Sequence, residues 1–141
     1  MSSLQTFKII YNDCYGGFDL SNNGLEEYNR RTSKNVSLPD YIDREDIDLI
    51  EMVETMDAKK INSNNSKLKI KELPIKFRSF LRWNEYDGKE SVTIDYTNYI
   101  VYNVKNILDT NISDDKKITL ISNLYIDLEK NYFYQMTPNS A

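Results

Sequence analysis

Short apolar runs in the first half of the chain predict two β-strands. Residues 7–12 read Phe-Lys-Ile-Ile-Tyr-Asn, a β-branched and largely apolar run that is typical of a buried strand. In residues 67–73, lysines alternate with Leu68 and Ile70, which indicates a strand with one solvated face. We expect both strands to belong to one small sheet.

A β-hairpin is predicted between residues 80 and 95. Two strand-like runs, 80–86 and 89–95, flank Asp87-Gly88, which is typical of a two-residue hairpin turn. Such a turn sets the cross-strand pairs as Leu81 with Ile94, Arg82 with Thr93, and Trp83 with Val92. The four apolar side chains then share one face of the hairpin, so the hydrophobic pattern and the turn agree on the same register.

Apolar residues at three- and four-residue spacing predict helices in the rest of the chain. A helix over residues 22–31 follows Ser21, which is a suitable N-cap. A second is expected over residues 43–58, where acidic residues occupy the first turn. Beyond residue 96 the pattern predicts two more helices, the second of them capped by Ser113.

Together these elements predict an α+β fold in a single domain, residues 1–141. We expect a small, mostly antiparallel sheet with a β-hairpin, covered by helices over residues 7–95. Residues 96–141 form a helical extension, a C-terminal helical hairpin that packs on the remaining sheet face or on a second copy of the chain. A chain of this length buries enough surface for a core without disulfides or metals.

Composition removes several classes of function. The 141 residues contain 18 Lys and Arg, 22 Asp and Glu, no His and one Cys. Without His there is no Ser-His-Asp triad, Cys-His pair or His-ligated metal, and one Cys forms no internal disulfide or zinc cluster. The net charge of −4 argues against binding to nucleic acid or anionic membranes. We therefore expect no cofactor and lean against an enzyme.

The segment from Asp13 to Ser21 is the best candidate for a ligand site, because it joins a buried strand to a helix N-terminus. Such a turn can present backbone N–H groups to an anion, and paired glycines let a ligand approach the backbone. The candidate ligand-binding residues are Asp13, Cys14, Tyr15, Gly16, Gly17, Phe18 and Ser21. The alternative is structural: the glycines allow a tight turn, while Cys14 and Phe18 belong to the core.

The hairpin tip offers weak candidates for a metal site. Glu85 and Glu90 face each other across the predicted hairpin, and Asp87 lies in its turn. Oxygen ligands of this kind suit Ca²⁺ or Mg²⁺. The alternative is a solvated hairpin end whose carboxylates point apart, so we assign no metal to the chain.

Four blocks of the sequence resemble a family of short uncharacterised proteins of phages and large DNA viruses. The blocks are Tyr11-Asn12-Asp13-Cys14-Tyr15-Gly16-Gly17-Phe18-Asp19-Leu20-Ser21, then Arg44-Glu45-Asp46, Leu68-Lys69-Ile70-Lys71-Glu72-Leu73-Pro74 and Trp83-Asn84-Glu85-Tyr86-Asp87-Gly88-Lys89-Glu90. They occur in the family's order and spacing and span about residues 7–95. The chain departs from the family at Asp19, where glycine is usual, and in its extended tail. The resemblance implies a viral origin and a compact α+β domain, but no activity.

The sequence therefore favours a non-enzymatic viral binding module whose site lies at the Gly-Gly turn. Its partner is a small anionic ligand or a viral or host protein, and the C-terminal helices offer a contact for a homo-oligomer. One alternative is a metal-dependent hydrolase that uses carboxylates; another is a structural component of a virion or oligomer. The N-terminus lacks a cationic segment followed by an apolar run, and no stretch is long enough to span a membrane. We expect the protein in the cytoplasm of an infected cell or in the virion.

Overall fold

The computed structural model describes residues 5–133 and combines five helices with four antiparallel strands in that range, which confirms the α+β class. The chain divides into two compact units, Met1–Ile94 and Asp95–Ala141. The elements of the first unit are β1 (Thr6–Asn12), α1 (Asn22–Thr32), α2 (Ile47–Thr55), α3 (Ala58–Ile61), β2 (Leu68–Pro74), β3 (Leu81–Tyr86) and β4 (Lys89–Ile94). The second unit holds α4 (Tyr96–Asp109) and α5 (Asp114–Asn131).

The strands form two separate two-stranded sheets, whereas the sequence predicted a single sheet. β1 pairs with β2, with Phe7 opposite Leu73, and β3 pairs with β4. The predicted hairpin register is confirmed. Leu81 lies opposite Ile94, Arg82 opposite Thr93, and Trp83 opposite Val92. The two sheets are joined by side-chain packing rather than by a shared hydrogen-bond ladder. The alternation of residues along a strand indicates which face is buried, but it does not say whether the strands form one sheet or two.

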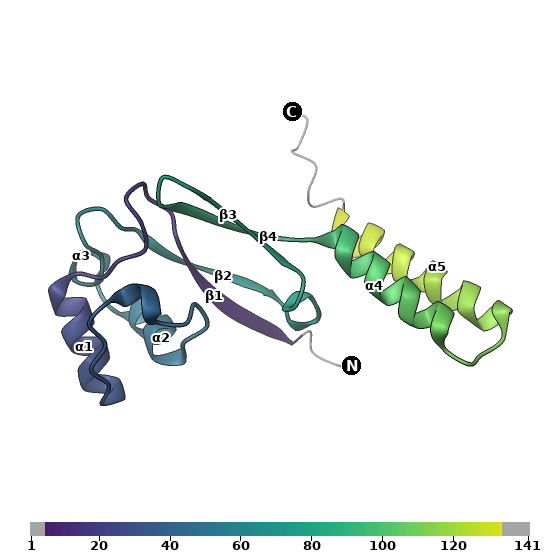
Figure 1. Ribbon diagram of the computed structural model, residues 1–141, viewed down its shortest axis with the longest axis horizontal. Helices are drawn as coiled ribbons and strands as arrows, with labels where there is room; N and C mark the ends of the chain where they lie inside the picture. The colour runs from purple at the N-terminus through teal and green to yellow at the C-terminus, as the bar shows by residue number, and fades with distance from the viewer. Residues whose placement is uncertain (1–4, 134–141) are drawn as a thin grey trace. The chain divides into compact units, whose positions relative to one another are not determined.

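The first unit has three layers, which Figure 1 shows as the helices, the β1–β2 sheet and the β3–β4 hairpin. Side chains along β1 alternate between the two outer layers. Ile10 faces the helices and is fully buried in a cluster with Leu49 and Met52 of α2. Phe7 and Ile9 face the other way and pack with Val92 of the hairpin. The β1–β2 sheet is therefore covered on both faces, as expected for a strand with apolar residues at both odd and even positions.

The predicted helix over residues 43–58 is wrong at both ends: α2 occupies only Ile47–Thr55, and a separate short helix, α3, begins at Ala58. The side chain of Asp46 accepts a hydrogen bond from Leu49 N and caps α2, while Asp57 accepts one from Lys59 N and caps α3. Asp46, which we placed in the first turn of the predicted helix, is thus the N-cap of α2, and Asp57, near its predicted end, is the N-cap of a separate helix. The Ser21 cap of α1 is confirmed, since its hydroxyl accepts a hydrogen bond from Gly24 N.

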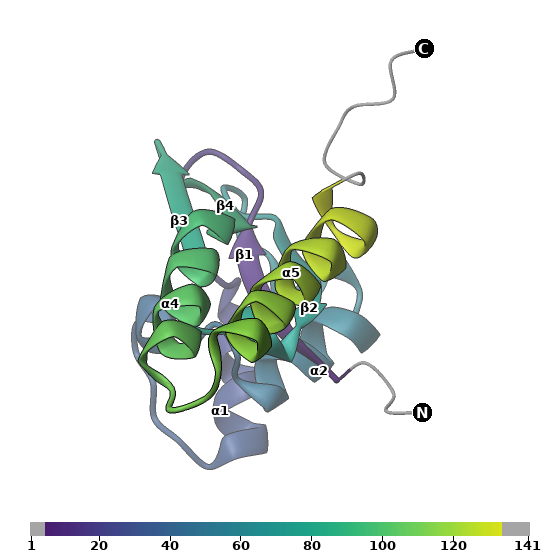
Figure 2. The same ribbon diagram turned by 90° about the vertical axis from the view of Figure 1, so that its right-hand side faces the viewer.

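Helices α4 and α5 run side by side in opposite directions (Figure 1 and Figure 2). Asp95 caps α4, which places the start of the helix at Tyr96 in a region whose β-branched residues blurred the prediction. The predicted Ser113 cap of α5 is confirmed, because its hydroxyl accepts a hydrogen bond from Lys116 N. Within residues 5–133, no helix combines the length and the hydropathy that crossing a membrane demands.

The buried phenol of Tyr28 gives the first test of this fold. Its hydroxyl donates a 2.8 Å hydrogen bond to Asp46 Oδ2 and so ties α1 to the cap of α2. We expect Tyr28→Phe to lower the free energy of unfolding by about 1–2 kcal/mol, because a charge-assisted bond is lost beside a carboxylate that stays in place. Tyr41→Phe is the control, because Tyr41 is 79% exposed, and it should change stability by less than about 0.5 kcal/mol. Equal urea midpoints for the two variants would contradict this role for Tyr28.

Candidate functional site

The Gly-Gly turn packs against the tip of the β3–β4 hairpin. Gly16 N donates a 2.9 Å hydrogen bond to the carbonyl of Asp87. Gly16, Gly17 and Gly88 all have positive φ angles, and a Cβ on Gly88 would lie 2.6 Å from the carbonyl carbon of Gly16 and closer still to Gly17 N. The two glycine-containing motifs of the sequence are therefore two halves of one backbone contact that no larger residue at position 88 would allow.

A buried amide, Asn12, holds this contact in place. Its Nδ2 group donates to the carbonyls of Cys14 (2.8 Å) and Gly88 (2.9 Å), and its Oδ1 accepts from Lys67 N (2.8 Å). Asn12 is completely buried, and its side chain uses both donors and one acceptor position. The end of β1, the Gly-Gly turn, the start of β2 and the hairpin tip therefore meet at one side chain.

Arg44 and Glu90 form the second link between the hairpin and the rest of the unit. Glu90 accepts a 2.9 Å hydrogen bond from Asn12 N and pairs with Arg44 Nη2 at 3.1 Å. The guanidinium carbon of Arg44 lies 3.2 Å from the centroid of the Phe18 ring, a cation–π contact. The Arg44 carbonyl accepts from Ile10 N, so this residue also fixes the outer edge of β1.

The other predicted ligand-binding residues occupy different surroundings. Phe18 is buried in the core with the helices, and Cys14 is half-buried. Tyr15 is exposed and makes an edge contact with Tyr86, with 6.4 Å between ring centroids. Ser21 caps α1 and also donates to the carbonyl of Lys60. The structure thus gathers only part of the predicted set around one place.

Three backbone donors of the turn have partners within the chain. Besides Gly16 N, Leu20 N donates to Asp19 Oδ1, and Ser21 N donates to the carbonyl of Ile61 at 2.7 Å. Because each N–H group supplies a single proton, these donors are committed in this conformation. Binding of a small anion at the turn stays a prediction, and of its two alternatives the partner protein needs fewer free N–H groups.

The three acidic residues of the hairpin tip are divided among different tasks. Glu90 points to Asn12 and Arg44, whereas Glu85 accepts from Gly88 N and steadies the turn. Asp87 contributes its backbone carbonyl to Gly16 and adopts a positive φ of 49°. Over residues 5–133, no group of three or more acidic or Cys side chains is arranged to hold a metal ion.

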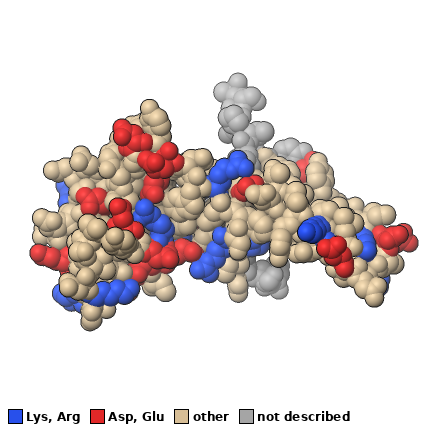
Figure 3. Space-filling model, viewed as in Figure 1, with Lys and Arg blue, Asp and Glu red and all other residues tan. Residues whose placement is uncertain are grey.

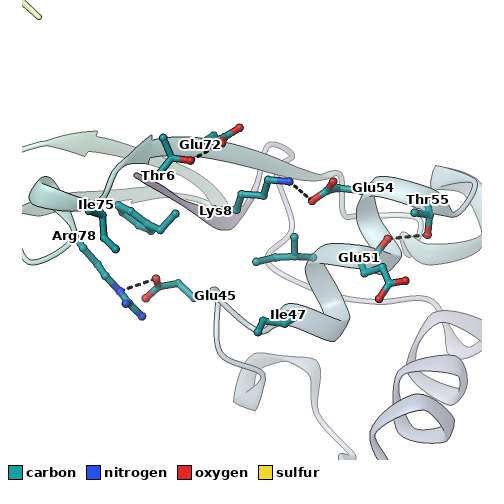
Figure 4. A pocket seen from close by; sticks show the side chains of 12 residues that line it. Thr6, Lys8, Glu45, Ile47, Glu51, Glu54, Thr55, Glu72, Ile75 and Arg78 are labelled. Carbon is teal, nitrogen blue, oxygen red and sulfur yellow. Dashed lines mark hydrogen bonds and ion pairs between the residues drawn. The ribbon is translucent and has the colours of Figure 1, made fainter. Parts of the chain in front are cut away.

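A groove of about 600 Å³ lies between the outer edge of β1 and helix α2 (Figure 4). Its apolar lining comes from Phe7, Ile47, Ile50 and Ile75. Two ion pairs cross it: Lys8 Nζ lies 2.8 Å from Glu54 Oε1, and Arg78 Nε lies 2.9 Å from Glu45 Oε1. The hydrogen bond to Glu54 raises the pKa of Lys8, so this amine is charged at neutral pH. Exposed apolar side chains framed by surface charges are typical of a protein-binding groove.

A second hollow of about 640 Å³ continues along the same strand and shares Glu45 and Arg78 with the first. Ile9 lies in its lining, together with the aromatic side chains of Tyr41 and Trp83. The Glu45–Arg78 ion pair is thus the boundary between two hollows on one side of β1. The edge of β1 that lies between them faces away from β2: Ile10 N bonds to the carbonyl of Arg44, and by alternation the backbone of Thr6 and Lys8 also points away from β2.

Sequence reasoning missed Asn12, Arg44 and the groove. Both residues lie inside the blocks that resemble the virus family, and that co-occurrence was the available signal. The groove had no local signal, because it combines β1, α2 and the segment after β2. Ile47 is 80% accessible, whereas the other apolar residues of α2 are buried or half-buried.

Loss of the Asn12 amide tests the structural role of the clasp formed by Asn12, Gly16, Gly17 and Gly88. We expect Asn12→Ala to lower the free energy of unfolding by about 2–4 kcal/mol, because the change removes a fully buried amide and its three hydrogen bonds to the backbone of Cys14, Gly88 and Lys67. Asn84→Ala, at an exposed position of β3, is the matched control and should cost less than about 0.5 kcal/mol. Urea unfolding followed by tryptophan fluorescence measures both, and a loss below 1 kcal/mol for Asn12→Ala would refute the role.

The ion pair of Asp13 gives the unit a defined dependence on acid. Lys69 Nζ lies 2.5 Å from Asp13 Oδ2, and this hydrogen bond lowers the pKa of the carboxyl below its ordinary value of 3.8. A lowered pKa stabilises the fold above the ordinary value, and the contribution disappears as pH falls through the folded-state pKa. Asp13→Asn should therefore have a lower melting temperature than the parent. The difference in melting temperature should be constant between pH 5 and pH 7 and should become smaller below about pH 4. A margin that grows on acidification would show the opposite linkage.

Comparisons with protein-family models, with curated proteins and with solved structures find no match to this chain. What the protein does is therefore inferred from its own residues, distances and charges.

Proposed function

We propose that the protein is a non-enzymatic binding module that captures an extended, basic and apolar segment of another polypeptide in the groove beside β1. The observation that carries the proposal is the combination of an edge of β1 that does not pair with β2 and an apolar groove alongside it. Strand addition uses such an edge for main-chain hydrogen bonds and uses pockets for alternate side chains. Of the ligands expected from the sequence, a partner protein fits this arrangement.

The lining supplies the apolar contacts that a bound segment needs. Ile47 and Ile75 are exposed at the groove, and Ile50 and Phe7 are largely buried beneath it. In Figure 4, Ile47 and Ile75 come from opposite walls, α2 and the segment that follows β2. A strand added at Thr6–Lys8 would place every second side chain between these walls, because side chains alternate along a strand.

Charge selects the class of segment. Among the lining residues, the four carboxylates of Glu45, Glu51, Glu54 and Glu72 face the two cations of Lys8 and Arg78. Exposed ion pairs such as Lys8–Glu54 and Arg78–Glu45 contribute about 0–1 kcal/mol each, so a ligand cation can replace one partner at low cost. The excess of carboxylates therefore favours a segment that carries Lys or Arg beside its apolar residues.

The resemblance to the virus family supports a proposal about where the protein meets its partner. It suggests a partner of viral or host origin, met in the cytoplasm of an infected cell or inside the virion. Within this proposal the Gly-Gly turn and the hairpin tip keep β1 and its neighbours in position, and they leave the groove to contact the partner.

The test is a titration of the full chain with fluorescent eight-residue peptides. We expect Lys-Val-Lys-Val-Lys-Val-Lys-Val to bind with a Kd of roughly 10 µM to 1 mM, whereas the Glu-Val analogue and an analogue with alternate N-methylated amides should bind at least about tenfold more weakly. Ile47→Ser should weaken binding by a similar factor without unfolding the protein, because it removes an exposed apolar contact of the groove and leaves the charge of the groove unchanged.

Leu38→Ser is the matched control, because Leu38 is an exposed aliphatic residue outside the groove lining. It should bind the basic peptide like the parent. Failure of the basic peptide to bind, or equal binding by the N-methylated analogue, would rule out strand addition at β1. A rise in Tm with orthophosphate or nucleotides, without peptide binding, would instead support the anion site at the Gly-Gly turn.

A further inference from the structure

The second hollow, on the hairpin side of β1, combines aromatic rings with carboxylates. Its volume is about 640 Å³, and its lining includes the rings of Tyr41 and Trp83 and the carboxylates of Asp40, Asp43 and Glu45. Tyr41 is 79% exposed and Trp83 is 40% exposed, so a ligand can reach both rings. The face of an aromatic ring attracts a cation, and a neighbouring carboxylate adds to that attraction. The lining therefore has the chemistry of a cation site.

Arg44 and Arg78 also line the hollow, but each is paired with another carboxylate. Arg78 Nε lies 2.9 Å from Glu45 Oε1, and Arg44 forms the 3.1 Å ion pair with the hairpin described above. Within residues 5–133, no Lys or Arg lies within ion-pair distance of Asp40 or Asp43. Elsewhere on the visible face of this unit, Lys and Arg side chains lie beside Asp and Glu side chains (Figure 3). The two aspartates therefore give the hollow a negative charge that a cationic ligand would balance.

The chain itself shows twice how a guanidinium group is held. The guanidinium carbon of Arg44 lies 3.2 Å from the centroid of the Phe18 ring, and that of Arg78 lies 6.0 Å from the centroid of the Phe7 ring. Each of these arginines also has a carboxylate partner. A planar guanidinium stacks on a ring while its N–H groups bond to a carboxylate, and an ammonium group lacks this geometry. The rings and aspartates of the hollow offer the same two contacts to an arginine from another chain.

The hollow begins where the proposed strand addition ends. The carbonyl of Arg44 accepts from Ile10 N, so the chain's own residues occupy the edge of β1 from that point on. A segment added beside Thr6 and Lys8 therefore leaves the edge next to Ile9. Residues opposite each other in a sheet direct their side chains to the same side, and Ile9 lies in the lining of the hollow. The last strand residue of the segment thus directs its side chain toward the hollow.

We propose that the second hollow binds the guanidinium group of an arginine in the captured segment, at the position opposite Ile9. The guanidinium stacks on Tyr41 or Trp83 and bonds to the carboxylates of Asp40 and Asp43. The identity of the segment rests on the function proposed for the groove, whereas the guanidinium site rests on the lining of the hollow alone. The partner class narrows from a segment with Lys or Arg to one with Arg at a fixed position.

The first experiment tests the hollow without a peptide. Trp83 is the only tryptophan of the chain, so its indole N–H gives a single signal of this kind in a ¹H–¹⁵N spectrum of the full chain. We expect Nα-acetyl-arginine methylamide to move this signal with a Kd on the order of 1–10 mM. The citrulline analogue has nearly the same shape and no charge, and it should bind at least about fivefold more weakly.

Paired tyrosine variants test the aromatic contact. Tyr41→Ser removes a ring of the hollow, whereas Tyr86→Ser is the control, because Tyr86 is 77% exposed and lies outside this lining. Tyr41→Ser should weaken binding of the arginine probe at least about threefold, and Tyr86→Ser should leave the Kd unchanged.

Paired aspartate variants test the charge. The double variant Asp40→Asn, Asp43→Asn should also weaken binding of the probe at least about threefold, and Asn keeps the side-chain oxygen that accepts from the backbone at position 43. The control is Asp114→Asn, Asp115→Asn in the first turn of α5, which changes the net charge of the chain by the same amount. It should bind the probe like the parent.

The second experiment tests whether the captured segment fills the hollow. Labelled Arg-Val-Arg-Val-Arg-Val-Arg-Val should bind the full chain at least about threefold more tightly than its Lys-Val counterpart, and Tyr41→Ser should remove this difference. Equal affinities of the two peptides, with the Trp83 signal unmoved, would overturn the placement of arginine and leave the groove proposal standing.

The two proposals can fail separately. A Trp83 signal that stays in place up to about 50 mM arginine probe would overturn the inference whatever the peptides do. A shift that is equal with citrulline, or that the Tyr41 and aspartate variants leave unchanged, would overturn it as well, because the contact would then lie elsewhere. A shift specific to arginine, without binding of either peptide, would support the guanidinium site and contradict strand addition at β1.

Discussion

The N-terminal unit depends on the buried amide of Asn12. Its side chain bonds to three backbone groups, which belong to the Gly-Gly turn, the hairpin tip and the residue before β2. A hydrogen-bonded amide in such a place contributes little net energy when complete, but each unpaired group costs about 1–3 kcal/mol. The fold therefore depends on the complete network. If the Gly-Gly turn, the hairpin tip or the start of β2 moves out of place, several hydrogen bonds are lost together.

The neighbouring ion pair extends this condition to the hairpin and the helices. Arg44 neutralises Glu90, which also accepts from Asn12 N, and it covers the Phe18 ring. Partly buried charges are stable when they are paired and hydrogen-bonded, and removal of one partner leaves the other desolvated. The two resembling blocks that contain Arg44 and Glu90 are thus in physical contact. We infer that the collinear motifs of this chain are first of all the parts of a folding clasp.

Local features could be predicted from the sequence, and long-range ones could not. The hairpin register followed from Asp87-Gly88 and the flanking alternation, since a two-residue turn leaves one set of partners. The break between α2 and α3 was missed, because Asp57 in a run of helix-compatible residues gives the same apolar spacing whether it caps or continues a helix. The separation of the two sheets was missed too, because a strand pattern identifies a buried face and does not name the partner strand.

The candidate site shows the same division. The glycines of the turn were identified, because few other residues tolerate their φ angles, but their contact with Gly88 joins positions that are about seventy residues apart. Asn12 looked like the last residue of a strand, and its role appears only when three backbone groups surround it. The groove could not be predicted for a similar reason, since Ile47 and Ile75 form a groove only because the folded chain brings them to opposite sides of the edge of β1.

The shallow groove has a consequence for affinity. A single groove with exposed ion pairs holds a short segment weakly, because ordering the segment offsets much of the contact energy. A partner whose basic and apolar segment is already extended, held so by the structure around it, has less conformational freedom to lose on binding. Weak binding of a free peptide therefore suits a partner with a pre-ordered segment, whereas a disordered segment would require a deeper groove than this one.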